Sequence, residues 1–155
     1  MEYQDYLRLL QDLCRELDTL AQVERDKASA VREHDLDALN ACMKREQAVT
    51  LALRGLDQKR ERLLSALELS GVSLREMPRR CPAEYREETR RAVERVLNCY
   101  EVVRSSQEPA RVLLESGLRQ VEEELRRQGV EPELDDRYQS APASRPGRLR
   151  TDITV

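Results

Sequence analysis

The side chains that most often carry out chemistry are scarce in this sequence. It holds one histidine, His34, and four cysteines, at positions 14, 42, 81 and 99. No two cysteines stand close enough to form a C-x-x-C pair, and a zinc site normally draws on such tight spacing. His34 falls at a predicted helix junction, where a histidine is most often an ordinary surface residue. The sequence therefore predicts neither a metal site nor a catalytic histidine.

Other catalytic patterns are missing as well. There is no glycine-rich phosphate loop and no G-x-S-x-G sequence, and acidic runs such as Glu122-Glu123-Glu124 are typical of solvated helix surfaces. The net charge is −3, with acidic and basic residues mixed along the chain, whereas a nucleic-acid-binding protein is expected to show a basic face. We expect a protein that is not an enzyme, uses no cofactor and binds no nucleic acid.

The apolar residues suit long helices better than a thick core. They make up 39% of the chain, charged residues make up 37%, and the aromatic residues are five tyrosines with no phenylalanine or tryptophan. Met1 leads directly into a charged amphipathic segment, and no apolar run approaches the ~20 residues that span a bilayer. We expect an all-α cytoplasmic protein that does not insert into a membrane.

Two long helices are predicted first, over residues 2–33 and 36–70. Apolar residues recur in both at the a and d positions of a seven-residue repeat, which is typical of helices packed side by side. The polar residues in the first helix predict looser packing toward its C-terminal end. In all, four of the repeat positions are polar, namely Glu24, Lys27, Glu46 and Arg60.

The link between these helices is short. Asp35 is a suitable N-cap for the second helix, and Gly71 is suited to end it. A link of this length predicts an antiparallel hairpin with arms about 50 Å long. A single uninterrupted helix through Asp35 is the alternative.

A capped turn is predicted before a third helix. Ser73 and Glu76 have the spacing of a capping box, and Pro78 is expected to close the single turn that they open. Pro82 is suited to the first turn of the third helix.

Pro109 lies inside the third predicted helix, where it removes a backbone hydrogen bond, yet the apolar pattern continues across it. We therefore expect one long helix, kinked near residues 105–109 and ending at Gly129, with two separate helices as the alternative. The segment 130–155 contains three of the six prolines among mostly polar residues, so it is predicted to be a disordered tail. The chain would then be one helical domain, residues 1–129, followed by this tail.

The chemistry that remains is binding. Around Val112-Leu113-Leu114, apolar side chains point in more than one direction, so a slender bundle cannot cover all of them. Such a face can accept an amphipathic helix from a partner. Self-association of the chain as a homodimer would hide the same face and is the alternative.

Several short segments form a recognisable order along the chain. They are Leu10, Leu13, Glu16, Leu17 and Leu20; Leu36-Asp37-Ala38-Leu39; Lys44-Arg45-Glu46; Lys59-Arg60-Glu61-Arg62-Leu63-Leu64; Gly71-Val72-Ser73-Leu74; and Val112-Leu113-Leu114-Glu115-Ser116 with Leu118 and Val121. In order, length and intervening turn, this pattern resembles the FlgN-type flagellar export chaperones over roughly residues 5–128. Ser105-Ser106-Gln107 and Pro109 stand where that family usually shows an Asn-rich step.

The resemblance implies a cytosolic chaperone for the hook–filament junction proteins. It would bind their C-terminal amphipathic regions, prevent premature association, and deliver them to the flagellar type III export apparatus without nucleotide or metal. Tyr138 would be a candidate contact with the export gate. A structural coiled-coil scaffold that oligomerises is the alternative function. The implied client-binding residues lie on the third helix: Val112, Leu113, Leu118, Val121 and Leu125.

Overall fold

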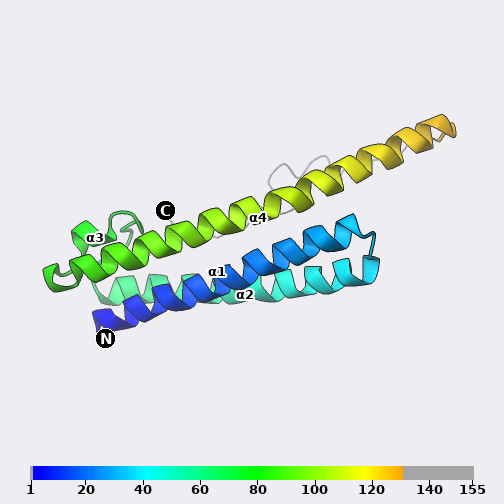
Figure 1. Ribbon diagram of the computed structural model, residues 1–155. Coiled ribbons are helices and arrows are strands. Elements are labelled where there is room, and N and C mark those ends of the chain that lie inside the picture. The colour runs from blue at the N-terminus through cyan, green and yellow to red at the C-terminus, as the bar shows by residue number, and fades with distance from the viewer. Residues whose placement is uncertain (1, 131–155) are drawn as a thin grey trace.

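The computed structural model describes residues 2–130 of the chain, and long helices dominate that range. It has no strand there, so the all-α prediction is confirmed, and the helices form an elongated, coiled-coil-like bundle (Figure 1). The tail from residue 131 and Tyr138 lie outside the described residues. The elements in chain order are α1 (Tyr3–Arg32), α2 (Leu36–Ala66), α3 (Met77–Arg80), the 3-10 helix η1 (Ala83–Tyr85) and α4 (Arg86–Arg127).

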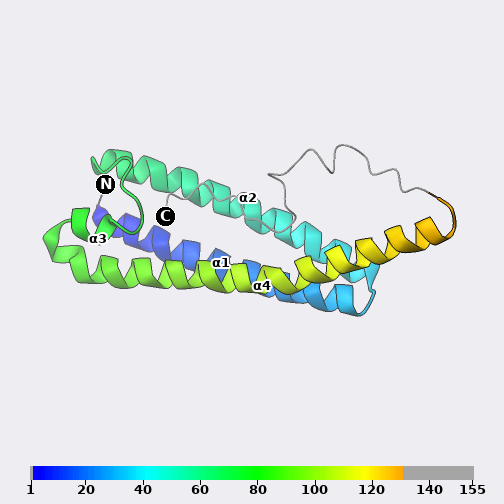
Figure 2. The same ribbon diagram turned by 90° about the horizontal axis from the view of Figure 1, so that it is seen from above.

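Helix α1 is the centre of the bundle. It lies between α2 and α4, and the two outer helices pack on it rather than mainly on each other (Figure 1 and Figure 2). Fourteen of its 30 residues are buried, against six of 31 in α2 and five of 42 in α4. This wide buried face arises because Cys14, Ala21 and Ala28 extend the a/d stripe of α1.

The turn between α1 and α2 folds as a hairpin. His34 adopts the left-handed conformation with a φ of 55°, and the Asp35 amide donates to the Ala30 carbonyl at 3.0 Å, which ends α1. The Asp35 carboxylate then accepts a hydrogen bond from the Ala38 amide at 3.0 Å and caps α2. The predicted N-cap and hairpin are confirmed, and the uninterrupted helix is excluded.

Helix α2 ends four residues earlier than the sequence predicted. Glu68 takes the left-handed position, with a φ of 59°, and the Leu69 amide donates to the Leu64 carbonyl at 2.8 Å. Gly71 also has a positive φ, 79°, but it lies in the turn that follows. The prediction that Gly71 ends the helix was therefore wrong, because a glutamate occupies the position that usually favours glycine.

The segment between α2 and α3 folds under the end of the bundle. The Glu76 amide donates to Ser73 Oγ at 3.3 Å, which is half of the predicted capping box. Leu74 and Met77 are fully buried and fix the segment to the core. Pro78 lies in the first turn of α3 and does not close the preceding turn, so that prediction was wrong. Proline suits this position because its fixed φ and missing amide fit the first turn of a helix.

The same end of the bundle holds α1 and α4 together. Pro82 precedes η1, and α4 begins only at Arg86, so the prediction that Pro82 opens the long helix was early by one turn. The Tyr3 hydroxyl and Thr89 Oγ1 form a buried hydrogen bond of 2.7 Å. The Tyr3 ring also stacks on Tyr85, with 5.0 Å between ring centres. These contacts fix where α4 starts relative to α1.

Helix α4 is continuous and includes Pro109. The prediction of one long helix is confirmed, and two separate helices are excluded. Its axis bends gently along its second half (Figure 2), as expected where a proline leaves the Ser105 carbonyl without its amide donor. Gly129, with a φ of 78°, follows the last turn as predicted, and its amide donates to the Arg126 carbonyl at 3.0 Å.

Three of the four polar residues that interrupt the apolar pattern are buried, and the fourth, Glu46, is partly buried. Glu24 and Lys27 are 1% and 7% exposed, so the prediction of looser packing at this end of α1 was wrong. Lys27 Nζ lies 3.0 Å from Glu46 Oε2 of α2, and the Glu24 and Glu46 carboxyls are within hydrogen-bonding reach. Arg60 is likewise buried and lies beside the Tyr6 hydroxyl. The polar interruptions of one helix thus face polar groups of the other.

This cluster predicts a pH-dependent stability. Burial, together with the neighbouring Glu46 carboxyl, raises the pKa of Glu24 from 4.5 to about 8. Between those two values the folded chain holds a proton that the unfolded chain has released, so the free energy of unfolding falls as the pH rises. Glu24→Gln mimics the protonated form. We expect this variant to be more stable than the unmodified chain by about 2–4 kcal/mol at pH 8 and by less than about 1 kcal/mol at pH 5.

Urea denaturation at the two pH values measures this difference. Glu33→Gln is the control, because it removes one exposed carboxylate near the hairpin turn and leaves the buried cluster intact. Equal pH dependence in the Glu24→Gln variant and the unmodified chain would contradict the assignment of a proton to Glu24.

Candidate functional site

Helix α4 extends beyond the helix on which it packs. The two run in the same direction, and side-chain contacts from Asp18 to Cys99 and from Arg25 to Ser106 each join residues 81 positions apart. With this offset of 81, Arg32, the last residue of α1, lies beside position 113 of α4. Residues 114–127, which we name the projecting segment, therefore pass the end of α1 by about 21 Å. Figure 1 shows this part of α4 continuing past the hairpin turn.

The projecting segment carries an apolar strip, formed by Leu114, Leu118, Val121 and Leu125. Their spacing of four, three and four residues places them on one face of the helix. The same face carries Val103 and Ala110 earlier in α4, which are buried. The strip is therefore the continuation of the bundle-facing side of α4 at a point where α1 has ended.

The strip is open to solvent. Leu114, Leu118 and Val121 are 36%, 56% and 57% exposed, and Leu125 is partly buried. Ala110 is the last buried residue of α4. A row of large apolar side chains at coiled-coil spacing is normally covered, so this surface is suited to a second helix.

The structure brings together three of the five residues predicted to bind a client. Leu118, Val121 and Leu125 share the strip, whereas Val112, 48% exposed, lies close to the opposite side of α4. Leu113 is partly buried and lies about 100° around the helix from the strip. Leu114 belongs to the strip but was not among the predicted site residues. The signal that could have found it is its spacing from Val103 and Ala110. Tyr138 lies outside the described residues.

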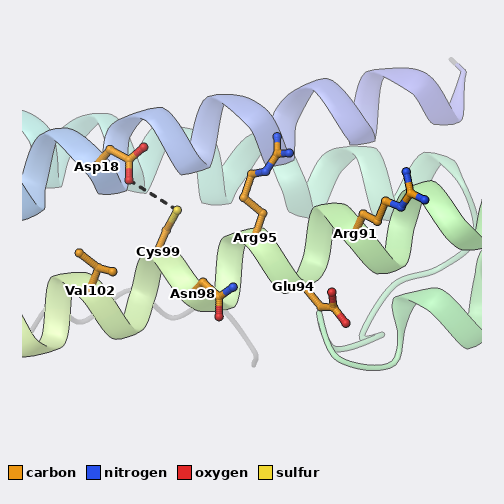
Figure 3. A pocket seen from close by; sticks show the side chains of 7 residues that line it. All are labelled: Asp18, Arg91, Glu94, Arg95, Asn98, Cys99 and Val102. Carbon is orange, nitrogen blue, oxygen red and sulfur yellow. Dashed lines mark hydrogen bonds between the residues drawn. The ribbon is translucent and has the colours of Figure 1, made fainter.

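The thiol of Cys99, on the surface between α1 and α4, is not a reactive nucleophile. A shallow pocket on the α1–α4 surface is lined by Asp18, Cys99 and neighbouring α4 side chains (Figure 3). Cys99 Sγ lies 3.6 Å from Asp18 Oδ1, and Figure 3 shows the two side chains pointing toward each other. Burial raises the pKa of Cys99 to about 12, with Cys14 and Asp18 adding to the effect. The thiol therefore stays protonated near neutral pH.

Other chemistry finds no support in residues 2–130. No three side chains of the metal-binding types gather there, and each helix in this range is too short or too polar to span a bilayer. His34 serves the hairpin turn through its backbone conformation. The arrangement can offer a partner an apolar helical surface.

The fold and the strip define an all-α protein with a surface suited to another polypeptide helix. The sequence model of the FlgN protein family matches residues 1–127, and the chain belongs to this family of flagellar export chaperones. No curated protein and no solved structure matches the chain. The resemblance seen in the sequence is confirmed, and a family of chaperones rather than enzymes agrees with the prediction that the chain is not an enzyme.

An exposed strip predicts that its side chains contribute little to folding. Leu118→Ala should lower the free energy of unfolding by less than about 0.5 kcal/mol, because the side chain is already in water. Leu53→Ala is the matched core substitution, since Leu53 is fully buried on α2, and should cost about 2–5 kcal/mol. Chemical denaturation of both variants measures the difference. A comparable loss in Leu118→Ala would mean that Leu118 is buried in the folded protein in solution.

Proposed function

We propose that this chaperone binds the C-terminal amphipathic regions of hook–filament junction proteins in the cytoplasm. It keeps these regions from associating early and delivers the bound client to the flagellar type III export apparatus. Membership of the FlgN family supports the general role in flagellar export. The observation that carries the choice of client is the exposed apolar strip of α4, because an amphipathic helix is the kind of partner that such a strip fits.

The geometry of the strip supports a helix lying alongside α4. Residues spaced by four and three fit between the side chains of a second amphipathic helix, as in a coiled coil. An apolar client helix left uncovered would be prone to aggregate, and covering it with the strip removes that hazard. Val112 and Leu113 remain predicted client contacts. They lie on other sides of α4, so a client that reaches them has to extend around the helix.

The size of the strip suggests a reversible complex. Burying one leucine or valine side chain completely contributes about 1.5–3 kcal/mol. The four side chains of the strip are already partly covered, so together they contribute less than about 10 kcal/mol. Association itself costs about 4–15 kcal/mol, so the strip alone cannot give a permanent complex. This suits a chaperone that has to release its client at an export gate, for which Tyr138 remains a candidate contact.

The alternative is a scaffold that oligomerises through the same strip. The coiled-coil spacing of Leu114, Leu118, Val121 and Leu125 is the observation that favours it, because identical strips could pair with each other. A scaffold or homodimer would show a melting temperature that rises with protein concentration. The chaperone would show a one-to-one complex with the C-terminal region of a client.

Co-purification with the C-terminal region of a junction protein from the same organism tests the proposal. The double variant Leu118→Ser with Val121→Ser removes the exposed centre of the strip, so we expect the affinity to fall at least about tenfold. Its circular dichroism should remain helical. Val112→Ser tests in parallel whether the other side of α4 also contacts the client.

The matched control is Leu51→Ser, which removes an exposed leucine from α2, far from the strip in sequence. It should leave binding unchanged. Client binding by the double variant at full strength would remove the strip from the site. Absence of any complex with the unmodified chain would contradict the proposed choice of client.

A further inference from the structure

Glutamates recur along α4 with the period of a coiled coil. A seven-residue interval is close to two helical turns, so residues spaced in this way follow one side of the helix. The row runs from the first turn of α4 to the projecting segment. It consists of Glu87, Glu94, Glu101, Glu108, Glu115 and Glu122.

Arginines neutralise the part of this row that lies along the bundle. Arg90 pairs with Glu87 at 2.7 Å and with Glu94 at 2.8 Å. Arg104 pairs with Glu101 at 3.5 Å. These arginines stand three residues after a glutamate, which is an ordinary ion-pair spacing on a helix surface.

The arginine pairing of this row stops after Glu115, inside the projecting segment. Arg111 pairs with both Glu108 and Glu115, the latter at 3.0 Å. After it, the positions three residues beyond Glu115 and Glu122, the last two glutamates of the row, hold Leu118 and Leu125 in place of arginine. Glu122 consequently forms no ion pair with any residue that the structure describes. The row of glutamates thus becomes an acidic border of the apolar strip.

The charges beside the strip are acidic, whereas the back of the projecting segment carries both signs, with Glu123 among the arginines. Glu115 and Glu122 border the strip on one side and Glu124 on the other, each within about 90° of its centre. Glu124 is loosely paired with Arg127, at 3.7 Å. The arginines at positions 119, 126 and 127 lie more than about 100° from the strip centre, toward the back of α4.

We infer that the helix seated on the strip carries lysine or arginine beside its own apolar residues. Charges that border the apolar seam of a coiled coil decide which partner is accepted. An acidic border favours a basic one across the seam. Two copies of the projecting segment would bring acidic borders together, and like-charge repulsion disfavours that pairing. The inference rests on the proposed function, since it specifies the client that the strip accepts.

Two synthetic helical peptides test the charge preference on the full chain. Both have leucines at the a and d positions, and one carries lysine and the other glutamate at the bordering positions. By fluorescence anisotropy at low salt, we expect the lysine peptide to bind at least about tenfold more tightly. The preference should shrink in 0.5 M NaCl, because salt screens exposed charges.

Substitutions at two adjacent positions distinguish an effect of the acidic border on binding from an effect of the net charge of the chain. Glu122→Lys changes the border and should weaken binding of the lysine peptide about three- to tenfold. Glu123→Lys makes the same change in net charge on the opposite side of α4 and should change the affinity less than about twofold. Equal effects of the two substitutions would reduce the preference to net charge and overturn the inference.

Further outcomes distinguish this inference from the proposed function. If both peptides bind equally and Leu118→Ser weakens both, the strip remains a binding site and the charge preference is wrong. If neither peptide binds while a junction-protein C-terminal region does, the inference falls and the proposed client stands. The full chain could also self-associate, and Leu118→Ser could abolish that self-association. This result would assign the strip to a second copy of the chain and overturn the inference.

Discussion

The packing register of α4 on α1 is the constraint on which the rest of the structure depends. The hydrogen bond between Tyr3 and Thr89, with the Tyr85 ring stacked on Tyr3, fixes the starts of the two helices side by side. From there they run in the same direction, but α4 has 42 residues and α1 has 30. The apolar phase of α4 continues through Ala110 into the residues that α1 cannot reach. A difference in helix length thereby becomes an exposed apolar surface.

This arrangement separates the residues that hold the fold from those that contact a partner. Helix α1 supplies the largest share of the core and is covered on two sides, so the bundle keeps its packing without the end of α4. The strip can then have a sequence suited to binding, with large apolar side chains in water and acids along its border. The buried cluster of Glu24, Lys27 and Glu46 fixes how α2 pairs with α1, far from the strip in sequence.

Much of the fold could be predicted because its signals are local. Heptad spacing gave the long helices and Asp35 gave the hairpin. A polar residue in the apolar stripe can be paired by a residue that is distant in the sequence. From α1 alone Glu24 predicts weak packing, and only the register of the hairpin places Glu46 opposite it. Glu68 was missed because a glutamate gives no signal for a left-handed conformation. At the site, the spacing of the apolar residues predicted that some of them are exposed. It could not show that Val112 lies outside the strip, because that depends on which side of α4 the bundle buries.

Hydrogen exchange with mass spectrometry, with and without a junction-protein C-terminal region, tests the central claim most directly. Helix α4 beyond residue 113 lacks a packing partner in the free chain and gains one when the client binds. Amides of residues 114–127 should exchange faster than those of α1 in the free protein and become protected on binding. Protection that appears only in α1 and α2, or a segment already as protected as α1 in the free chain, would contradict it.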